Sequence, residues 1–232
     1  MDIYKQTIGQ TTAQPLVQST AYETRPQVSP DGSWLLYFDE TANELRRVPI
    51  EGGPPETVLA LKGSTLLRCP ARTGHSCVLS QVESDEVIFY ALDPVEGKGH
   101  ELARTRKETS FHEAWDLSPD ATHAALVNMT NRIQVIPLNG EAQAELVVDR
   151  WWGIEYIAWA ADGKGLFING FSPRGPTWPR GALLYVSLEG TAHVLYDKPN
   201  EWDVRPYASP DGRYLAFAGM IFDSHAWMIE DF

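Results

Sequence analysis

The chain has 232 residues, of which 43% are hydrophobic, 11% aromatic and 22% charged. This composition is typical of a globular protein with a sizeable core, and it excludes a disordered or fibrous chain. The formal net charge is −12 at pH 7. Such an acidic surface repels phosphate backbones, so no nucleic acid is expected as a partner. The longest apolar stretch, residues 214–222, is far shorter than the roughly 18 residues of a membrane-spanning helix.

The sequence contains few features that indicate the cellular compartment of the protein. The first residues lack the basic and apolar regions of a secretory signal, so the sequence as given is expected in the cytoplasm. Within a longer chain, a periplasmic or extracytoplasmic location is the alternative. Cys69 and Cys77 are the two cysteines, too few for a disulfide scaffold or a paired zinc motif. They could approach each other across one hairpin, but the expectation is two half-buried strand cysteines without a function.

A four-residue motif, Ser-Pro-Asp-Gly, occurs at residues 29–32 and recurs unchanged at residues 209–212. With three weaker copies included, its second position falls at residues 30, 70, 119, 161 and 210, in steps of 40 to 49 residues. Pro fixes φ, Asp accepts from nearby N–H groups and Gly supplies a positive φ, so each copy predicts a tight turn between two strands. A period of this length is typical of β-propeller blades. The weaker copies are residues 69–74, 118–121 and 160–163.

The predicted elements follow in chain order. Residues 2–19 align with the segment 42 residues further on, and we expect them to be strands three and four of a blade without its first two strands. Aromatic-rich runs after the turns, such as residues 33–38 and 213–217, predict buried strands, and alternating runs such as residues 132–140 predict half-exposed third strands. No segment of ten or more residues has a persuasive helical periodicity, so an all-β fold with four strands per blade is expected. The expected blades, in one domain, are residues 22–61, 62–104, 111–149, 153–197 and 202–232.

The turn with its following strand, and the alternating strand that ends in Gly-Gly at residues 44–53, resemble the TolB-type, WD40-like β-propeller repeat. The resemblance covers nearly the whole chain. It implies a propeller used as an interaction platform or as an appendage to another domain. Residues 200–232 are also similar to the end of propellers that follow bacterial Ser/Thr kinase or winged-helix domains, and neither such domain is in this sequence.

The strand count leaves ring closure open. Residues 207–218 and 226–232 supply strands one to three of the last blade, without a fourth. One solution is a β-propeller of about five blades in which the N-terminal strands, residues 15–19 among them, complete the last blade and remove an exposed edge. The alternative is a fragment of a ring with six or more blades, whose open edges take strands from a partner or form a dimer. A closed ring predicts a monomer.

The sequence lacks catalytic signatures. It contains no GxSxG, no HExxH, no GxxxxGK[ST] and no paired CxxC. Residues 112–116 begin like a zincin motif but lack the second histidine, so no zinc site is expected. These absences predict a protein that is not an enzyme.

Candidate binding residues precede the first strand of each blade, because these segments converge on the channel where propellers usually bind ligands. An aromatic-acid-x-Arg-Pro pattern occurs at residues 22–26 and 202–206. It fits an inter-blade salt bridge, or a rim whose arginines bind the carboxylates of a peptide. A tryptophan in the loop insertion of residues 170–181 is either an exposed anchor or folded back over a blade. The candidates are Tyr22, Glu23, Arg25, His112, Glu113, Glu155, Tyr156, Trp178, Trp202, Asp203 and Arg205.

The leading hypothesis is a non-catalytic TolB-like propeller that acts as a protein-interaction or sensory module for a protein or peptide. One alternative is a propeller that binds a small ligand or calcium, with hydrolase- or lactonase-like activity. Another is the remnant of a longer regulatory protein. No cofactor is expected beyond the calcium of the first alternative, for which the candidate ligands are Glu23, Asp116, Glu155 and Asp203.

Overall fold

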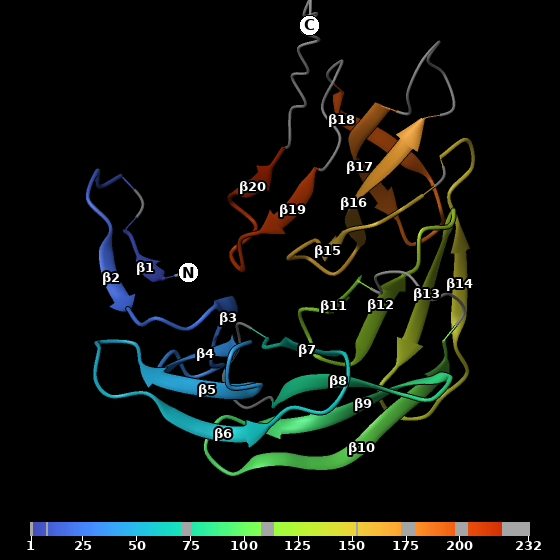
Figure 1. Ribbon diagram of the computed structural model, residues 1–232. Coiled ribbons are helices and arrows are strands. Elements are labelled where there is room, and N and C mark those ends of the chain that lie inside the picture. The colour runs from blue at the N-terminus through green and yellow to red at the C-terminus, as the bar shows by residue number, and fades with distance from the viewer. Residues whose placement is uncertain are drawn as a thin grey trace, which may run out of the picture. The chain divides into compact units, whose positions relative to one another are not determined.

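The computed structural model describes residues 2–7, 9–70, 76–107, 114–151, 153–172, 180–197 and 204–219. Within these ranges all regular elements are strands (Figure 1), which confirms the all-β prediction. In this part of the chain there is no helix long and apolar enough to cross a membrane.

Four four-stranded sheets form blades of the β-propeller type, and in each the strands are neighbours in chain order. The first contains β3 (Glu23–Val28), β4 (Trp34–Asp39), β5 (Glu44–Pro49) and β6 (Glu56–Ala60). The second contains β7 (Thr65–Arg68), β8 (Cys77–Glu83), β9 (Glu86–Asp93) and β10 (Gly97–Arg106). The third contains β11 (Ala114–Leu117), β12 (His123–Val127), β13 (Arg132–Pro137) and β14 (Ala144–Val147). The fourth contains β15 (Ile157–Trp159), β16 (Gly165–Ser172), β17 (Arg180–Ser187) and β18 (Ala192–Asp197).

Two further pairs of strands lie toward the ends of the chain. β1 (Ile3–Lys5) pairs with β2 (Gln14–Val17), and β19 (Arg205–Ala208) pairs with β20 (Leu215–Ala218), each pair antiparallel. Each pair is a two-stranded sheet of its own. A last blade completed by the N-terminal strands is therefore not among the sheets of the described residues, and ring closure stays a prediction.

The chain divides into two compact units, which are described separately. Unit 1 comprises Met1–Ser110, Asp116–Ala125 and Val135–Ala144, and it includes β1 to β10. Unit 2 comprises Phe111–Trp115, Leu126–Gln134 and Glu145–Phe232, and it includes β15 to β20. The strands of the third sheet are shared between them.

In unit 1 the second strand of a blade is its most buried strand. Leu36 and Phe38 of β4 point into an apolar cluster with Leu67, Cys77 and Leu79 of the second blade. The alternate residues of β4 pack in another cluster together with Ile3 and Val17 of the N-terminal strands. Because both faces of β4 are covered, the strand is a continuous apolar run rather than an alternating one.

The same burial does not extend to β20. The sequence predicted a buried strand at residues 213–217, yet Tyr214 and Phe217 are 49% and 41% exposed. The prediction was wrong because β20 lies in a sheet of only two strands among the described residues, whereas β4 is covered on both faces.

The Ser-Pro-Asp-Gly turns are closed by three hydrogen bonds, which we call the Ser–Asp lock. Ser29 Oγ donates to Asp31 Oδ1 (2.5 Å), Trp34 N–H donates to Ser29 Oγ (2.9 Å), and Ser33 N–H donates to Asp31 Oδ1 (3.0 Å). Gly32 has a φ of 74°, a left-handed conformation that glycine adopts more easily than residues with a side chain. The equivalent bonds recur in the turns that begin at Ser118 and Ser209.

Cys69 and Cys77 form a disulfide, which corrects the expectation of two separate thiols. β7 ends at Arg68 and β8 begins at Cys77, so the hairpin brings the two Cα atoms to 4.2 Å. Antiparallel pairing of the flanking strands is the physical reason that the two cysteines meet.

Candidate functional site

Tyr22 lies just before β3, as the repeat predicted, whereas Glu23 and Arg25 are in β3 itself. Arg25 has a φ of 52° and lies at a register shift between Thr24 and Gln27. A left-handed residue at a bulge redirects a side chain, and the Arg25 guanidinium donates from Nη1 to the Thr65 carbonyl of the second blade (3.2 Å).

The predicted inter-blade contact of Arg25 is thus present, but its partner is a backbone carbonyl. The ion pair of Arg25 is formed within the same blade, at 3.9 Å from Glu40. Glu23 is 1% exposed and accepts a hydrogen bond from Ser19 Oγ. Tyr22 is 56% exposed, so of these three residues Tyr22 and Arg25 are accessible to a partner.

Glu155, Tyr156 and Arg205 come together in unit 2. Asn169 is fully buried in β16, and its Oδ1 accepts from the N–H groups of Glu155 (2.9 Å) and Tyr156 (2.6 Å). These bonds fix the backbone in front of β15. The Arg205 guanidinium of β19 lies 4.5 Å from the centre of the Tyr156 ring. This cation–π contact joins two sheets of unit 2.

Five of the candidates, His112, Glu113, Trp178, Trp202 and Asp203, lie outside the described residues. The aromatic-acid-x-Arg-Pro pattern of residues 202–206 can therefore be followed only from Arg205 onward.

An inter-blade ion pair does occur where the sequence pattern did not indicate one. Arg68 Nε of β7 lies 3.1 Å from Asp116 Oδ1 of β11, with side chains 25% and 23% exposed. Asp116 was a candidate calcium ligand. The described ranges contain no group of three or more possible metal-ligating side chains. The Asp116 carboxylate pairs with the Arg68 guanidinium.

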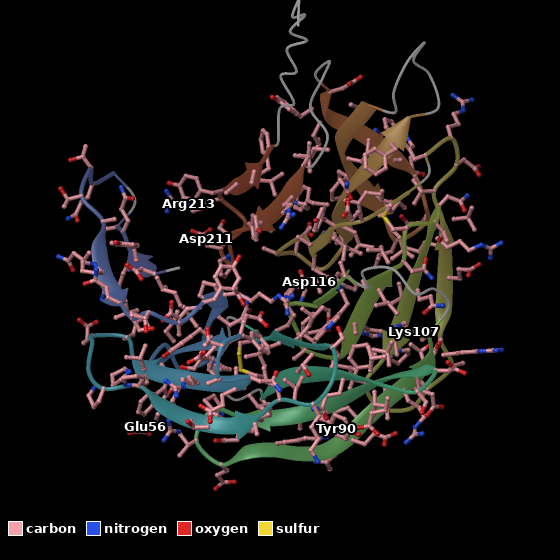
Figure 2. The ribbon with its side chains drawn as sticks, viewed as in Figure 1. Glu56, Tyr90, Lys107, Asp116, Asp211 and Arg213 are labelled. Carbon is pink, nitrogen blue, oxygen red and sulfur yellow. A yellow bond between two sulfur atoms is a disulfide. The ribbon has the colours of Figure 1, made fainter. Side chains whose placement is uncertain are left out.

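An aromatic surface at β19 and the turn before β20 was not predicted; we call it the Tyr–Arg surface and define it by Tyr207, Arg213 and Tyr214. Phe217 lies on the opposite face of this strand pair. Tyr207 is 59% exposed. The Arg213 guanidinium lies 5.5 Å from the centre of the Tyr214 ring and 4.0 Å from Asp211 (Figure 2). Phe217 packs against the Tyr196 ring, with centroids 4.8 Å apart. Tyrosines on both sides of the turn were the available signal, but the apolar run was interpreted as buried.

One hydroxyl contacts a possible base. Thr122 Oγ1 lies 2.7 Å from His123 Nδ1 and 2.7 Å from Asp120 Oδ1. Burial raises the pKa of Asp120, but the hydrogen bonds from Ser118 and Thr122 outweigh it and leave the pKa lowered. The Thr122 hydroxyl donates to the Asp120 carboxylate. This group belongs to a turn lock.

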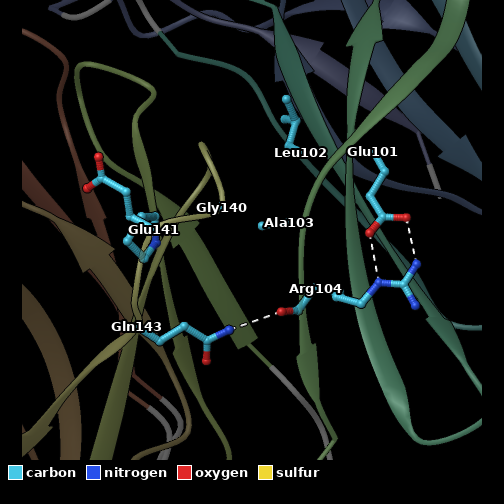
Figure 3. Close-up of a pocket in the computed structure, with 8 residues that line it drawn as sticks. Glu101, Leu102, Ala103, Arg104, Gly140, Glu141 and Gln143 are labelled. Carbon is cyan, nitrogen blue, oxygen red and sulfur yellow. Dashed lines mark hydrogen bonds and ion pairs between the residues drawn. The ribbon is translucent and has the colours of Figure 1, made fainter.

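A shallow pocket of about 330 Å³ lies in unit 1 beside β10 (Figure 3). Its one arginine, Arg104, makes 2.7 Å ion pairs with Glu101 and Glu86. These hydrogen bonds and charges lower the pKa of Glu101 and raise that of Arg104. Gln143 donates to the Arg104 carbonyl (3.0 Å), which caps part of the strand edge. The Arg104 guanidinium is thus engaged by two carboxylates of its own blade. Its lining residues are Glu101, Leu102, Ala103, Arg104, Pro137, Gly140, Glu141 and Gln143.

Four-stranded blades, repeated turn locks and arginine contacts between sheets define a β-propeller. No protein-family model matches the sequence, and no curated protein matches it.

Solved structures do match. TolB from Acinetobacter baumannii has a TM-score of 0.67 at 14% identity, over 88% of this chain and 50% of that chain. A putative TolB from Agrobacterium tumefaciens has a TM-score of 0.64 at 16% identity, over 94% of this chain and 83% of that chain. A chain of a nidogen/laminin complex has a TM-score of 0.65 at 13% identity, over 92% of this chain and 78% of that chain. The fold is thus the TolB-type β-propeller that the repeat indicated, and the chain spans about half the length of the Acinetobacter TolB chain.

Proposed function

We propose that this propeller is a non-catalytic interaction or sensory module that binds an acidic segment of a protein or peptide. The observation that carries the proposal is the Tyr–Arg surface. Tyr207 and Tyr214 expose 59% and 49% of their surface. Tyrosine and arginine are enriched among the residues that dominate binding energy at protein interfaces, because they combine contact area with hydrogen bonding.

Arg213 gives this surface a preference for carboxylate groups. Arg213 is 72% exposed and its nearest ion-pair partner is 4.0 Å away, so its guanidinium is accessible to a second carboxylate. A planar guanidinium binds a carboxylate through two parallel hydrogen bonds. A second exposed pair, Tyr22 and Arg25, has the same composition at the start of β3. One structurally similar protein, the nidogen/laminin assembly, is itself a complex.

Site-specific photo-cross-linking tests the proposal. A benzophenone amino acid replaces Tyr207 in one variant and Tyr4, a 54% exposed tyrosine of unit 1, in a control. We expect a discrete cross-linked partner from position 207 and none from position 4. Excess unlabelled wild-type chain should compete for this partner, and the Tyr214→Ala, Arg213→Ala double variant should not. Identical products from both positions, or equal competition by the double variant, would exclude the Tyr–Arg surface as the binding site.

A further inference from the structure

The Ser–Asp lock closes the turns that begin at Ser29, Ser118 and Ser209. The sequence of the second blade has neither the serine nor the aspartate of this lock, and the fourth blade has Ala160 in place of the serine. In the first blade, Ser29 and Trp34 are the residue pair just beyond the last ladder pair, Val28 and Leu35. Ser29 N–H donates to the Trp34 carbonyl (2.8 Å), and Trp34 N–H donates back to Ser29 Oγ (2.9 Å). The pairs Ser118–His123 and Ser209–Tyr214 have the same two bonds.

The disulfide occupies this same position in the second blade. The last ladder pair there is Arg68 and Val78, so the next pair outward is Cys69 and Cys77. Cys69 is aligned with Ser29, and the aspartate of the motif is replaced by Ala71. The two cysteines are 8 residues apart, against 5 for Ser29 and Trp34, so the hairpin has a longer connection without the Ser–Asp lock.

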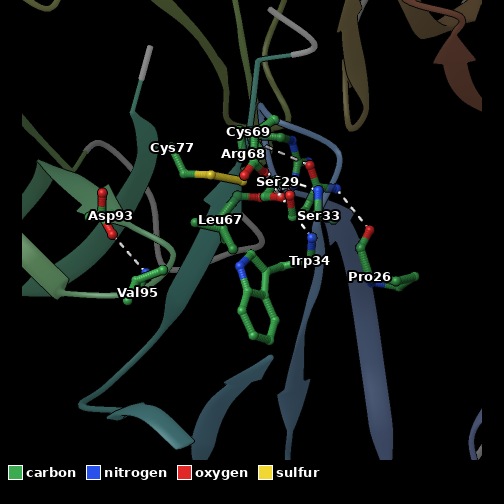
Figure 4. The surroundings of a disulfide bond; sticks show 12 residues. Pro26, Ser29, Ser33, Trp34, Leu67, Arg68, Cys69, Cys77, Asp93 and Val95 are labelled. Atoms are coloured by element: carbon green, nitrogen blue, oxygen red, sulfur yellow. Dashed lines mark hydrogen bonds between the residues drawn. A yellow bond between two sulfur atoms is a disulfide. The ribbon is translucent and has the colours of Figure 1, made fainter. Parts of the chain in front are cut away.

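The surroundings of the disulfide are those of a structural bond (Figure 4). Cys77 is fully buried in the apolar cluster that joins the first two blades, and Cys69 packs against that cluster. Cys69 N–H also donates to Gln27 Oε1 of β3 (3.4 Å). The bond therefore closes the hairpin and holds it against the neighbouring blade.

We propose that the Cys69–Cys77 disulfide is a covalent replacement for the Ser–Asp lock, so that the second blade is completed by an oxidation step. Two cysteine thiols and one molecule of glutathione disulfide give the protein disulfide and two glutathione thiols. One cysteine sulfur first forms a mixed disulfide and releases one glutathione thiol, and the other cysteine then displaces the second. Such bonds persist in oxidising compartments, so the inference favours the extracytoplasmic alternative for this chain.

Reduction under native conditions tests the replacement. Dithiothreitol should yield two alkylatable thiols and lower the melting temperature by roughly 5–10 °C. This is the shift expected when a disulfide that closes a loop of this length is broken. The Cys69→Ser, Cys77→Ser double variant should melt at the lower temperature with or without reductant. An Asp31→Asn variant, altered in another hairpin, should retain the full response. An unchanged melting temperature after confirmed reduction would overturn the proposal, as would two free thiols in protein purified without reductant from an oxidising compartment.

A second experiment grafts the Ser–Asp turn into the second blade. It tests whether the disulfide stabilises this hairpin in the same way as the Ser–Asp lock stabilises the hairpins that contain it. Residues 69–76 are replaced by Ser-Pro-Asp-Gly-Ser, and Cys77→Ala removes the second sulfur. We expect the graft to melt above the double serine variant and to be insensitive to dithiothreitol. A graft no more stable than the double serine variant would show that the disulfide is not the counterpart of the Ser–Asp lock.

Discussion

Asp31 shows how a single exposed residue specifies a turn. Its carboxylate accepts hydrogen bonds from the Ser29 hydroxyl and from Ser33 N–H. These bonds, the one from Ser29 first, lower its pKa from 3.8 to about 2. The hydrogen bond from Ser209 likewise lowers the pKa of Asp211 in the last turn. The charged form of the motif is therefore the form that closes the hairpin.

We expect Asp31→Asn to lower the melting temperature at pH 7 and to flatten its dependence on pH. The pKa is lower in the folded state, so the carboxylate contributes stability above its ordinary pKa of 3.8 and loses it as the pH falls toward 2. Melting curves of wild type and variant should differ most at neutral pH, by a few degrees at most since the turn is exposed, and converge near pH 2. Ser29→Ala should behave alike. Parallel curves over the whole range would contradict this role.

Arg25 marks the limit of prediction from sequence at this scale. The repeat predicted Tyr22, Glu23 and Arg25 in the segment before the first strand; Tyr22 lies there, whereas Glu23 and Arg25 are in β3 itself. The pattern also indicated a contact between blades, which Arg25 makes. The partner was not predictable, because it depends on a left-handed φ of 52° and on a carbonyl 40 residues away. A backbone acceptor leaves no signature in the sequence. Charge pairing therefore suggested a salt bridge between blades, where the charged guanidinium instead donates to a neutral carbonyl.

Contacts between the blades of unit 1 follow a common form, in which a long polar side chain reaches the next sheet. Arg47 donates to the Pro94 carbonyl (2.8 Å) and stacks on Trp34 (4.4 Å). Arg68 pairs with Asp116. Apolar clusters bury the second strand β4 between sheets, and these polar side chains add directional contacts that fix how neighbouring sheets meet.

A double-mutant cycle on Arg68→Ala and Asp116→Ala should give a coupling of roughly 0.5–1 kcal/mol in urea unfolding. Both side chains are about a quarter exposed, so solvent screens them only in part. The matched control is Arg104 with Glu86, a 2.7 Å pair within one blade whose side chains are 50% and 44% exposed. We expect a smaller coupling there. An equal or larger value for the control would show that burial between blades adds nothing to the Arg68–Asp116 pair.

Turns and strands were predictable from the sequence where nearby residues alone determine their geometry. Pro, Asp and Gly set the turn at residues 29–32 by their own geometry, and the blade repeat follows from it. The disulfide was not predictable, since the same two cysteines also fit two strand positions until the pairing of Arg68 with Val78 is known. The exposure of β20 was missed for a related reason. Composition reports that a strand is apolar, but the number of strands beside it decides whether it is buried.

The described residues include two sheets of only two strands, one toward each end of the chain. The repeat assigns β1 and β2 to strands three and four, and β19 and β20 to strands one and two. Together they amount to one four-stranded blade if residues 226–232, which lie outside the described residues, do not take the third position that the sequence predicts for them. A propeller with an incomplete blade exposes strand edges that pair readily with other chains, so the complementary halves predict closure within one molecule.

Light scattering with size-exclusion chromatography should accordingly give a monomer of 25.9 kDa. Closure also predicts that the N–H groups of β20 (Leu215–Ala218) exchange with deuterium more slowly than those on the outermost strands β10 and β18, because β20 becomes an inner strand. This protection should not change on dilution. A dimer, or protection that disappears at low protein concentration, would mean that the missing strands come from a second chain. The Tyr–Arg surface would then have to be assigned between two copies, because β19 and β20 would lie at their interface.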